Sequence, residues 1–154
     1  MDSSERLSYP PPSTYPTDLP RANMLRMWGH SPAVLQPIIS LGTACISSVS
    51  LPVKTRELLM LHCAHTMSCQ YMWTRHIEGG RKAGCTDSQI NALLNDDLNG
   101  SMWSEAESSM LVFLSEVIKH PDVSETTFED LKRHFNEREI IEILTMQASI
   151  LSWC

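Results

Sequence analysis

The sequence predicts an all-α protein with about seven helices, and three observations support this fold class. Apolar residues recur three and four positions apart over long stretches, which places them on one face of a helix. Ser, Thr or Asn stands three residues before Gln or Glu at several points, as in an N-terminal capping box. Strand-like alternation around Asn-Gly or Asp-Gly turns, which would indicate β-hairpins, does not compete with this pattern.

The first twenty residues differ in composition from the rest of the chain. They contain five of the nine prolines, with Ser and Thr between them and few aliphatic side chains. Such a segment cannot form a core, so residues 1–20 are predicted to be a proline-rich arm that is extended or disordered. Residues 21–154 are predicted to form a single helical domain, because a chain of 154 residues fits one domain with a buried core.

Helix signals then follow one another along the chain. A short amphipathic helix is predicted over residues 21–30. The next helix is expected to begin with Ser31 as N-cap and Pro32 as its first residue. Ser50 is the expected cap of the helix that includes "VKTRELLMLHCAH".

The later helices carry signals at their ends. Gly84 is a suitable C-terminal stop for "CQYMWTRHIEGGRKAG", because glycine adopts the left-handed backbone conformation that ends many helices. The segments "TDSQ", "SEAE", "TTFE" and "NERE" predict N-caps at Thr86, Ser104, Thr126 and Asn136. The last helix, "EREIIEILTMQASILSWC", has no C-terminal cap, and its apolar face is expected to need a neighbour.

Composition and charge exclude several classes of function. The net charge of −6, a pI near 5.4 and the lack of a Lys/Arg cluster argue against nucleic acid as a partner. The longest apolar runs fall short of the roughly 18 residues that a membrane span needs. The start, "MDSSERLSYPPPSTYP", lacks the basic and apolar regions of a secretory leader, so a cytoplasmic location is expected.

The five cysteines are odd in number and irregularly spaced, which argues against a disulfide framework. Four of them are expected to be buried thiols, because a free cysteine behaves as a small hydrophobic residue. The exception is Cys69, which stands within "MSCQYMWTRHIEGG".

In that segment a thiol and an imidazole fall on one side of a predicted helix. Cys69, Trp73 and His76 follow the spacing i, i+4, i+7, and Tyr71 lies about a quarter to a half turn away. Cys69 is also expected at the start of the helix, where backbone N–H groups favour a thiolate. A neighbouring imidazole can then act as base or proton carrier.

Glu57 is the candidate acidic partner, provided that the chain turns back. On one straight helix Glu57 and Cys69 would be separated by about 18 Å of rise and about 120° of rotation. The weak helix-forming segment "HTMS" allows a break, with Ser68 as cap of the second helix. Glu57, Cys69 and His76 would then form one proton-relay cluster, with His65 at the joint.

Ordinary structural roles compete with this interpretation for each residue taken alone. An isolated glutamate is usually solvated, an isolated buried cysteine is usually inert, and Tyr and Trp usually serve the core or an interface. A metal site is also conceivable from His62, Cys63, His65, Cys69 and His76. The spacings of known zinc motifs, Cys-x-x-Cys and His-Glu-x-x-His, are missing, so no metal is predicted.

The stretch "RELLMLHCAHTMSCQYMWTRHIEGGRKAGCTDSQI" resembles the carboxymuconolactone decarboxylase family, which includes the alkylhydroperoxidase AhpD-like proteins. The likeness extends in order and spacing over about residues 21–154. The residues that match the family pattern are Arg56, Glu57, Ala64, His65, Cys69, Tyr71, Trp73, His76, Ala83, Gly84 and Asp87. The resemblance implies an all-α fold with a helical hairpin that carries the site, and assembly as a homo-oligomer (dimer, trimer or hexamer).

The resemblance also bears on the reaction. Peroxidases of this family use a glutamate, two cysteines in Cys-x-x-Cys and a histidine four residues after the second cysteine. Glu57, Cys69 and His76 fall on matching positions, but Met72 replaces the second cysteine. A peroxidatic thiol needs a resolving partner, for which Cys63 is the remaining candidate in this segment.

The decarboxylase branch of the family works without a cofactor, by acid/base catalysis on a small carboxylated lactone. We therefore predict a cofactor-free enzyme that performs decarboxylation, isomerisation, cyclisation or lyase chemistry on a small organic intermediate. Its predicted catalytic residues are Glu57, Cys69 and His76, and its predicted substrate-binding residues are His65, Tyr71 and Trp73. Two alternatives are a thiol-dependent peroxidase or disulfide reductase that uses Cys69, and a non-catalytic oligomeric binding module whose arm contacts a partner.

Overall fold

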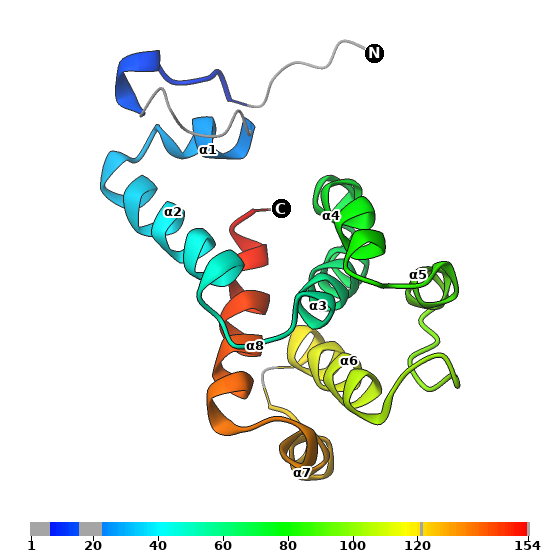
Figure 1. Ribbon diagram of the computed structural model, residues 1–154. Helices are drawn as coiled ribbons and strands as arrows, with labels where there is room; N and C mark the ends of the chain where they lie inside the picture. The colour runs from blue at the N-terminus through cyan, green and yellow to red at the C-terminus, as the bar shows by residue number, and fades with distance from the viewer. Residues whose placement is uncertain (1–6, 16–22, 121, 154) are drawn as a thin grey trace. The chain divides into compact units, whose positions relative to one another are not determined.

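Figure 1 shows the fold in a computed structural model, which describes residues 7–15, 23–120 and 122–153. These residues form eight α-helices and one short 3-10 helix, and they contain no strand. The prediction of an all-α fold is confirmed. The chain divides into two compact units, Met1–Ser48 and Val49–Cys154.

None of the helices that the structure describes is long and apolar enough to cross a bilayer.

The first unit contains a 3-10 turn at Pro12–Thr14, α1 at Asn23–Trp28 and α2 at Pro32–Ser47. Part of the proline-rich segment packs on α1, since the guanidinium carbon of Arg26 lies 3.9 Å from the centre of the Tyr9 ring. This contact is a cation–π interaction.

The predicted arm spans residues 1–20, of which residues 1–6 and 16–20 lie outside the described part of the chain. In the part that is described, the backbone carbonyl of Ser8 lies 2.8 Å from Nε2 of His30. Residues 7–15 thus have specific contacts within their own unit.

The second unit consists of six helices among its described residues. They are α3 (Val53–Thr66), α4 (Gln70–Lys82), α5 (Asp87–Leu94), α6 (Glu105–Lys119), α7 (Glu125–His134) and α8 (Glu137–Leu151). Helix α3 contacts α4, α5, α6 and α8, and every residue from Leu58 to Ala64 is buried. A helix enclosed on all sides must give each of its polar side chains a partner inside the protein.

Most of the predicted helix ends are present. The side chains of Thr86, Ser104 and Asn136 each accept a hydrogen bond from the backbone N–H three residues later, in complete capping boxes. Gly84 follows the C-cap of α4 with a φ of +98°, as predicted. Ser31 is the N-cap of α2, although its hydroxyl makes no capping hydrogen bond.

Two of the predicted caps are wrong. Helix α3 begins after Pro52, and Ser50 instead donates both its backbone N–H and its hydroxyl to Glu142 Oε2 of α8, each at 2.7 Å. Helix α7 begins after Ser124, two residues before Thr126, because the Ser124 hydroxyl already accepts a backbone N–H of the first turn. Ser50 is not a cap because it bonds to another helix, and Thr126 is not a cap because Ser124, which comes earlier in the chain, takes that role.

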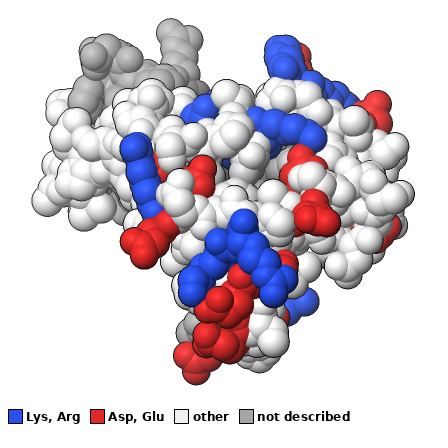
Figure 2. Space-filling model, turned by 60° about the horizontal axis from the view of Figure 1, so that its bottom comes forward, with Lys and Arg blue, Asp and Glu red and all other residues white. Residues whose placement is uncertain are grey.

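Charges of both signs lie next to one another on the exposed surface. Figure 2 shows acidic side chains beside the basic ones on the face that includes the bottom of Figure 1. On α7, Lys132 pairs with Glu129 at 2.7 Å and Arg133 pairs with Asp130 at 3.2 Å. This face therefore lacks the continuous basic surface that a phosphate backbone attracts.

His62 is the most deeply buried titratable imidazole of α3, with 1% of its surface exposed. Its Nε2 lies 2.8 Å from the hydroxyl of Ser115 on α6. That hydroxyl donates to the carbonyl of Leu111, so we assign the hydrogen of the imidazole to Nε2. Burial lowers the pKa of His62 from 6.5 to about 4, with Asp96 acting in the opposite direction.

This pKa shift predicts a loss of stability in mild acid. The unfolded chain takes up a proton on His62 below pH 6.5, whereas the folded protein does so only near pH 4, so stability falls as the pH decreases between these values. The free energy of unfolding is expected to fall by about 2 kcal/mol between pH 8 and pH 5 because of this residue. Urea denaturation of the wild type and of His62→Gln at both pH values measures the difference.

His62→Gln keeps a polar side chain but cannot be protonated, so its stability is expected to vary less with pH. His120 is exposed, and His120→Gln is the matched control. Equal pH dependence in His62→Gln and the wild type would contradict the assignment.

Candidate active site

The candidate site depends on a sharp reversal of the chain between α3 and α4. Only Met67, Ser68 and Cys69 separate the two helices, and Ser68 has a φ of +55°. The N–H of Cys69 bonds to the carbonyl of Ala64 at 2.7 Å, and the N–H of Ser68 bonds to that of His65 at 2.9 Å. This is the hydrogen-bond pattern of a Schellman motif, with serine at the left-handed position where glycine is usual. The predicted break is confirmed.

The predicted role of Ser68 as cap of the second helix is wrong. The N-cap of α4 is Cys69, whose backbone carbonyl accepts from the N–H of Trp73 at 3.1 Å. The side chain of Cys69 makes no capping hydrogen bond. Ser68 ends α3 instead, because its positive φ fits the residue after a helix C-terminus and not an N-cap.

The reversal brings Glu57 of α3 against His76 of α4. Nδ1 of His76 lies 2.9 Å from Oε2 of Glu57, although the two residues are nineteen positions apart. The His76 and Glu57 side chains are 23% and 21% exposed, so the pair is mostly shielded from water and still reachable. A contact of this kind gives a charge-assisted hydrogen bond.

Gly79 makes room for this pair. A Cβ at position 79 would lie 3.2 to 3.3 Å from the carboxylate atoms of Glu57. Gly79 follows His76 by three residues and therefore lies on the same side of α4. Sequence reasoning did not single out Gly79, although this spacing within "HIEGG" is the signal that could have found it.

The hydrogen bond fixes which nitrogen of His76 can act on a substrate. A carboxylate can only accept, so we assign the imidazole hydrogen to Nδ1. Nε2 of the neutral ring then carries the lone pair and can take up a proton. When it does so, Glu57 stabilises the positive ring, as the aspartate does in a Ser-His-Asp triad.

Cys69 differs from what the sequence predicted. It is buried and part of a disulfide, whereas the sequence indicated a thiol whose thiolate form is favoured by the start of the helix. Irregular cysteine spacing argued against disulfides, but spacing cannot reveal which sulfurs the fold brings together. Cys69 and His76 are seven residues apart on α4, which is about 10 Å along the helix axis.

The other cysteines agree with the prediction as far as the structure describes them. Cys45, Cys63 and Cys85 are buried and form no disulfide, and Cys154 lies outside the described residues. Burial raises the pKa of Cys63 to about 12. A buried thiol that favours its protonated form is a poor resolving partner for a disulfide at Cys69, so these surroundings disfavour the role considered for Cys63.

The three predicted substrate-binding residues lie in different surroundings. His65 contacts the edge of the Trp73 ring, with 6.1 Å between ring centres, and its Nε2 lies 3.5 Å from Asp96 Oδ1. Tyr71 is 41% exposed. A cavity of about 630 Å³ beside the joint includes His65 and Ser68 in its lining, but not Glu57, Cys69 or His76.

The fold places the side chains that could bind a metal ion in different surroundings. Within the described residues, no three His, Cys, Asp or Glu side chains come close enough together to hold a metal ion. His62 and His65, which the sequence offered as possible ligands, instead pair with Ser115 and Asp96.

Comparisons with known proteins relate this geometry to a family. The sequence model described as the carboxymuconolactone decarboxylase family matches residues 32–113, which is more than half of the chain. No curated protein matches the sequence.

Solved structures with similar folds come from proteins of low sequence identity. A protein of unknown function from Agrobacterium tumefaciens, described as a putative antioxidant defence protein AhpD, has a TM-score of 0.70 at 20% identity, covering 82% of this chain and 86% of that one. The debrominase Bmp8, solved with 2,3,4-tribromopyrrole, has a TM-score of 0.70 at 16% identity, with coverages of 85% and 71%.

A third similar structure is an alkylhydroperoxidase AhpD core, an uncharacterised peroxidase-related protein from Ralstonia eutropha JMP134. It has a TM-score of 0.69 at 19% identity, covering 83% of this chain and 70% of that one. At these identities the likeness establishes the AhpD-like helical fold.

Two adjacent glycines allow a matched test of the Glu57–His76 geometry. In Gly79→Ala the new Cβ forces the Glu57 carboxylate to move by a few tenths of an ångström, so the hydrogen bond to Nδ1 is expected to weaken. The expected result is a partial loss of the Nδ1–H tautomer of His76, measured by long-range ¹H–¹⁵N correlation of the imidazole at neutral pH. In Gly80→Ala the new Cβ meets Leu61 instead, and the tautomer is expected to stay.

Both substitutions raise helix propensity by about 1 kcal/mol, so that effect cancels in the comparison. An unchanged imidazole spectrum in Gly79→Ala, or the same change in both variants, would contradict the positioning role of Gly79.

Proposed function

Because the chain belongs to the carboxymuconolactone decarboxylase family, we propose that it is an enzyme that uses acid/base catalysis on a small organic molecule without a cofactor. The proposed catalytic groups are His76 and Glu57. His76 transfers the proton, and Glu57 orients the imidazole ring of His76 and stabilises its positive charge. The observation that carries this proposal is the 2.9 Å contact between His76 Nδ1 and Glu57 Oε2.

The Glu57–His76 pair, called the dyad below, can take a proton from a substrate or give one to it. In an isomerisation, Nε2 of neutral His76 takes a proton from a carbon next to a carbonyl and later returns it to another carbon. In a decarboxylation, the bond from the carboxylate to the adjacent carbon breaks and carbon dioxide leaves. The electron pair of the broken bond stays on the substrate and forms an enolate. Protonated His76 then delivers its Nε2 hydrogen to that carbon. Glu57 stabilises the imidazolium in both cases.

Met72 supports acid/base chemistry over the peroxidase mechanism implied by the family resemblance. Position 72 lies four residues before His76, so a cysteine there would be within reach of the imidazole. This chain has a methionine at that position, with 4% of its surface exposed. The next cysteine on α4 is Cys69, two turns from His76. The imidazole is therefore proposed to act on a bound substrate and not on a neighbouring thiol.

His65, Tyr71 and Trp73 are proposed to bind the substrate. The aromatic contact between His65 and Trp73 joins the end of α3 to the first turns of α4, and His65 lines the cavity beside the joint. Tyr71 is 41% exposed and is proposed to contribute its hydroxyl. Aromatic faces with a few polar groups are common in sites for small organic ligands.

The dyad is tested by replacing each member with an uncharged group of similar size. Glu57→Gln and His76→Gln are expected to lower kcat by about 10²- to 10⁴-fold, which is the usual contribution of positioned acid/base groups. The readout is carbon dioxide release from carboxymuconolactone, followed by other small carboxylated lactones. Circular dichroism checks that both variants are folded.

Glu78→Gln is the control for these variants. Glu78 is on the same helix, but its side chain is exposed and pairs with Lys82 at 2.9 Å. Retention of full turnover by both dyad variants would refute the proposal and favour a non-catalytic binding role.

The disulfide at Cys69 favours a second candidate function, thiol-dependent reduction of peroxides. In that reaction two thiols donate electrons to a hydroperoxide, the O–O bond breaks, and an alcohol, water and a disulfide are formed. Cys69 stands at the N-cap of α4 and takes part in a disulfide, so it is the thiol proposed to be oxidised in this reaction. Dithiothreitol can supply the electrons for the next turnover in a test.

This second function predicts that Cys69→Ser removes peroxide consumption. Cumene hydroperoxide loss is followed with dithiothreitol as reductant, and Cys85→Ser is the control because burial raises the pKa of Cys85 to about 11. If Cys69→Ser consumes peroxide as fast as the wild type, the thiol function is ruled out. If it also turns over a lactone at the full rate, only the acid/base function is supported.

Assembly as a homo-oligomer remains a prediction of the family resemblance. It is supported by large apolar side chains that are exposed in the single chain, among them Ile141 of α8 at 62% and Val53 of α3 at 55%. Side chains of this kind are frequently covered by a neighbouring subunit.

A further inference from the structure

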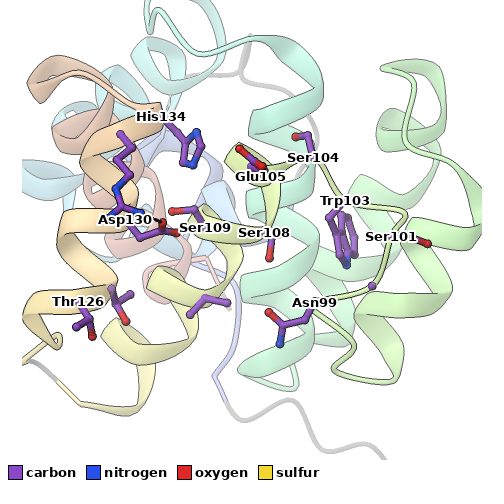
Figure 3. Close-up of a pocket in the computed structure, with 14 residues that line it drawn as sticks. Asn99, Ser101, Trp103, Ser104, Glu105, Ser108, Ser109, Thr126, Asp130 and His134 are labelled. Atoms are coloured by element: carbon purple, nitrogen blue, oxygen red, sulfur yellow. Dashed lines mark hydrogen bonds and ion pairs between the residues drawn. The ribbon is translucent and has the colours of Figure 1, made fainter.

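A second cavity, separate from the Glu57–His76 pair, lies between α6, α7 and the segment that leads into α6. Figure 3 shows it, with α6 on one side, α7 on the other and residues 99–104 closing one end. Its volume is about 760 Å³, which is within the range of small-molecule sites. Neither Glu57 nor His76 belongs to its lining, so a ligand in this cavity would be independent of the proposed function.

Hydroxyl groups dominate the walls of this cavity. Four serines and two threonines line it, together with the amide of Asn99 and the indole of Trp103. The hydroxyl-bearing residues are Ser101, Ser104, Ser108, Ser109, Thr126 and Thr127. A hydroxyl both donates and accepts, so such walls suit a ligand that does the same.

Ser109 is the residue that points to a ligand. It is 5% exposed, and its Oγ is buried with no hydrogen-bond partner. Figure 3 places this hydroxyl toward α7, where Asp130 and His134 face the same cavity. Leaving a buried hydroxyl unpaired costs about 1–3 kcal/mol.

A comparison with other helical hydroxyls shows that this arrangement is not imposed by the helix. Ser115, also on α6, donates to the carbonyl four residues before it at 2.9 Å, and Thr145 on α8 does so at 2.7 Å. Serine and threonine commonly satisfy themselves in this way inside helices. The Ser109 hydroxyl lacks this bond, and Ser109 is among the residues that line the cavity.

The charges around the cavity select against an anionic ligand. Glu105 and Asp130 each carry one negative charge, and Arg133 carries one positive charge. The guanidinium of Arg133 already bonds to Asp130 at 3.2 Å, so the positive charge is compensated. His134 adds a charge only when it is protonated. An anion would meet the carboxylate of Glu105 beside the N-terminus of α6.

We propose that this cavity binds a small, neutral, polyhydroxylated molecule of about monosaccharide size. Ser109 would exchange a hydrogen bond with one ligand hydroxyl, and the carboxylates of Glu105 and Asp130 would accept from others. The Trp103 ring has a fixed orientation, because its Nε1–H donates to the carbonyl of Asp97 at 2.7 Å. It offers an apolar surface to the C–H groups of such a ligand.

The proposal is tested by titrating the full-length protein with D-glucose and with myo-inositol while the backbone amides are observed by ¹H–¹⁵N NMR. The expected result is saturable shifts centred on Ser109 and His134 for at least one of these probes. Sodium phosphate and sodium acetate are titrated in parallel. Absence of saturable shifts with both neutral probes would overturn the proposal, and shifts with phosphate or acetate alone would overturn the proposed ligand class.

Ser109→Ala separates binding from a structural role. Affinity for the neutral probe is expected to fall at least tenfold, which corresponds to about 1.4 kcal/mol, one hydrogen bond. Without ligand the variant is expected to be as stable as the wild type or more so, because an unsatisfied hydroxyl has been removed. Unchanged affinity overturns the proposal.

Two further variants keep the test decisive. Asp130→Ala removes a proposed acceptor at the surface and is expected to weaken binding. It keeps the test decisive if Ser109→Ala does not fold. Thr145→Ala removes a hydroxyl outside the cavity and is expected to leave affinity unchanged. Equal losses in Thr145→Ala and Ser109→Ala would show that the effect is not local and would also overturn the proposal.

Discussion

The backbone reversal after α3 is the constraint on which the rest of the candidate site depends. Ser68 adopts a left-handed conformation, and the N–H groups of Ser68 and Cys69 close on the carbonyls at the end of α3. Without this turn Glu57 and His76 would be nineteen residues apart along one rod, about 28 Å. With it, their side chains meet at 2.9 Å. A non-glycine residue with positive φ is uncommon and is retained only where the surrounding contacts hold it. Here the extensive packing of α3 against α4 provides those contacts.

The burial of α3 explains why its polar side chains have such definite partners. A helix covered by four others has little access to water, so most of its buried polar groups bond to residues of neighbouring helices, with Nδ1 of His62 and Oγ1 of Thr66 as exceptions. His62 pairs with Ser115 of α6, and Glu57 pairs with His76 of α4. The two pairs have different access to solvent, since His62 is fully enclosed and His76 is 23% exposed. An enclosed imidazole serves packing, whereas a partly exposed one beside a carboxylate can exchange protons with a ligand.

The sequence predicted those features that local chemistry decides. Capping boxes involve residues only three positions apart, so Thr86, Ser104 and Asn136 were identified correctly. Ser50 failed as a cap because Glu142, ninety-two residues away, accepts its hydrogen bonds. The disulfide at Cys69 and the unpaired hydroxyl of Ser109 likewise depend on distant parts of the fold. The meeting of Glu57 with His76 was predictable because residues so far apart on one helix can cooperate only if the chain turns back, and the segment between them has low helix propensity.

The spacing of groups along α4 determines how the two possible chemistries of this hairpin relate to one another. An imidazole activates a thiol when it lies within hydrogen-bond reach, which on a helix means three or four residues. Met72 occupies that position, and Cys69 is one turn further away. His76 is instead held by Glu57 through Nδ1, which leaves Nε2 for a molecule from outside. Proton transfer by the dyad and redox chemistry at Cys69 therefore do not require each other. The hairpin can lose the acid/base pair without losing its fold, since the residues that make the turn are separate from the carboxylate and the imidazole, whereas Cys69 is itself part of the turn.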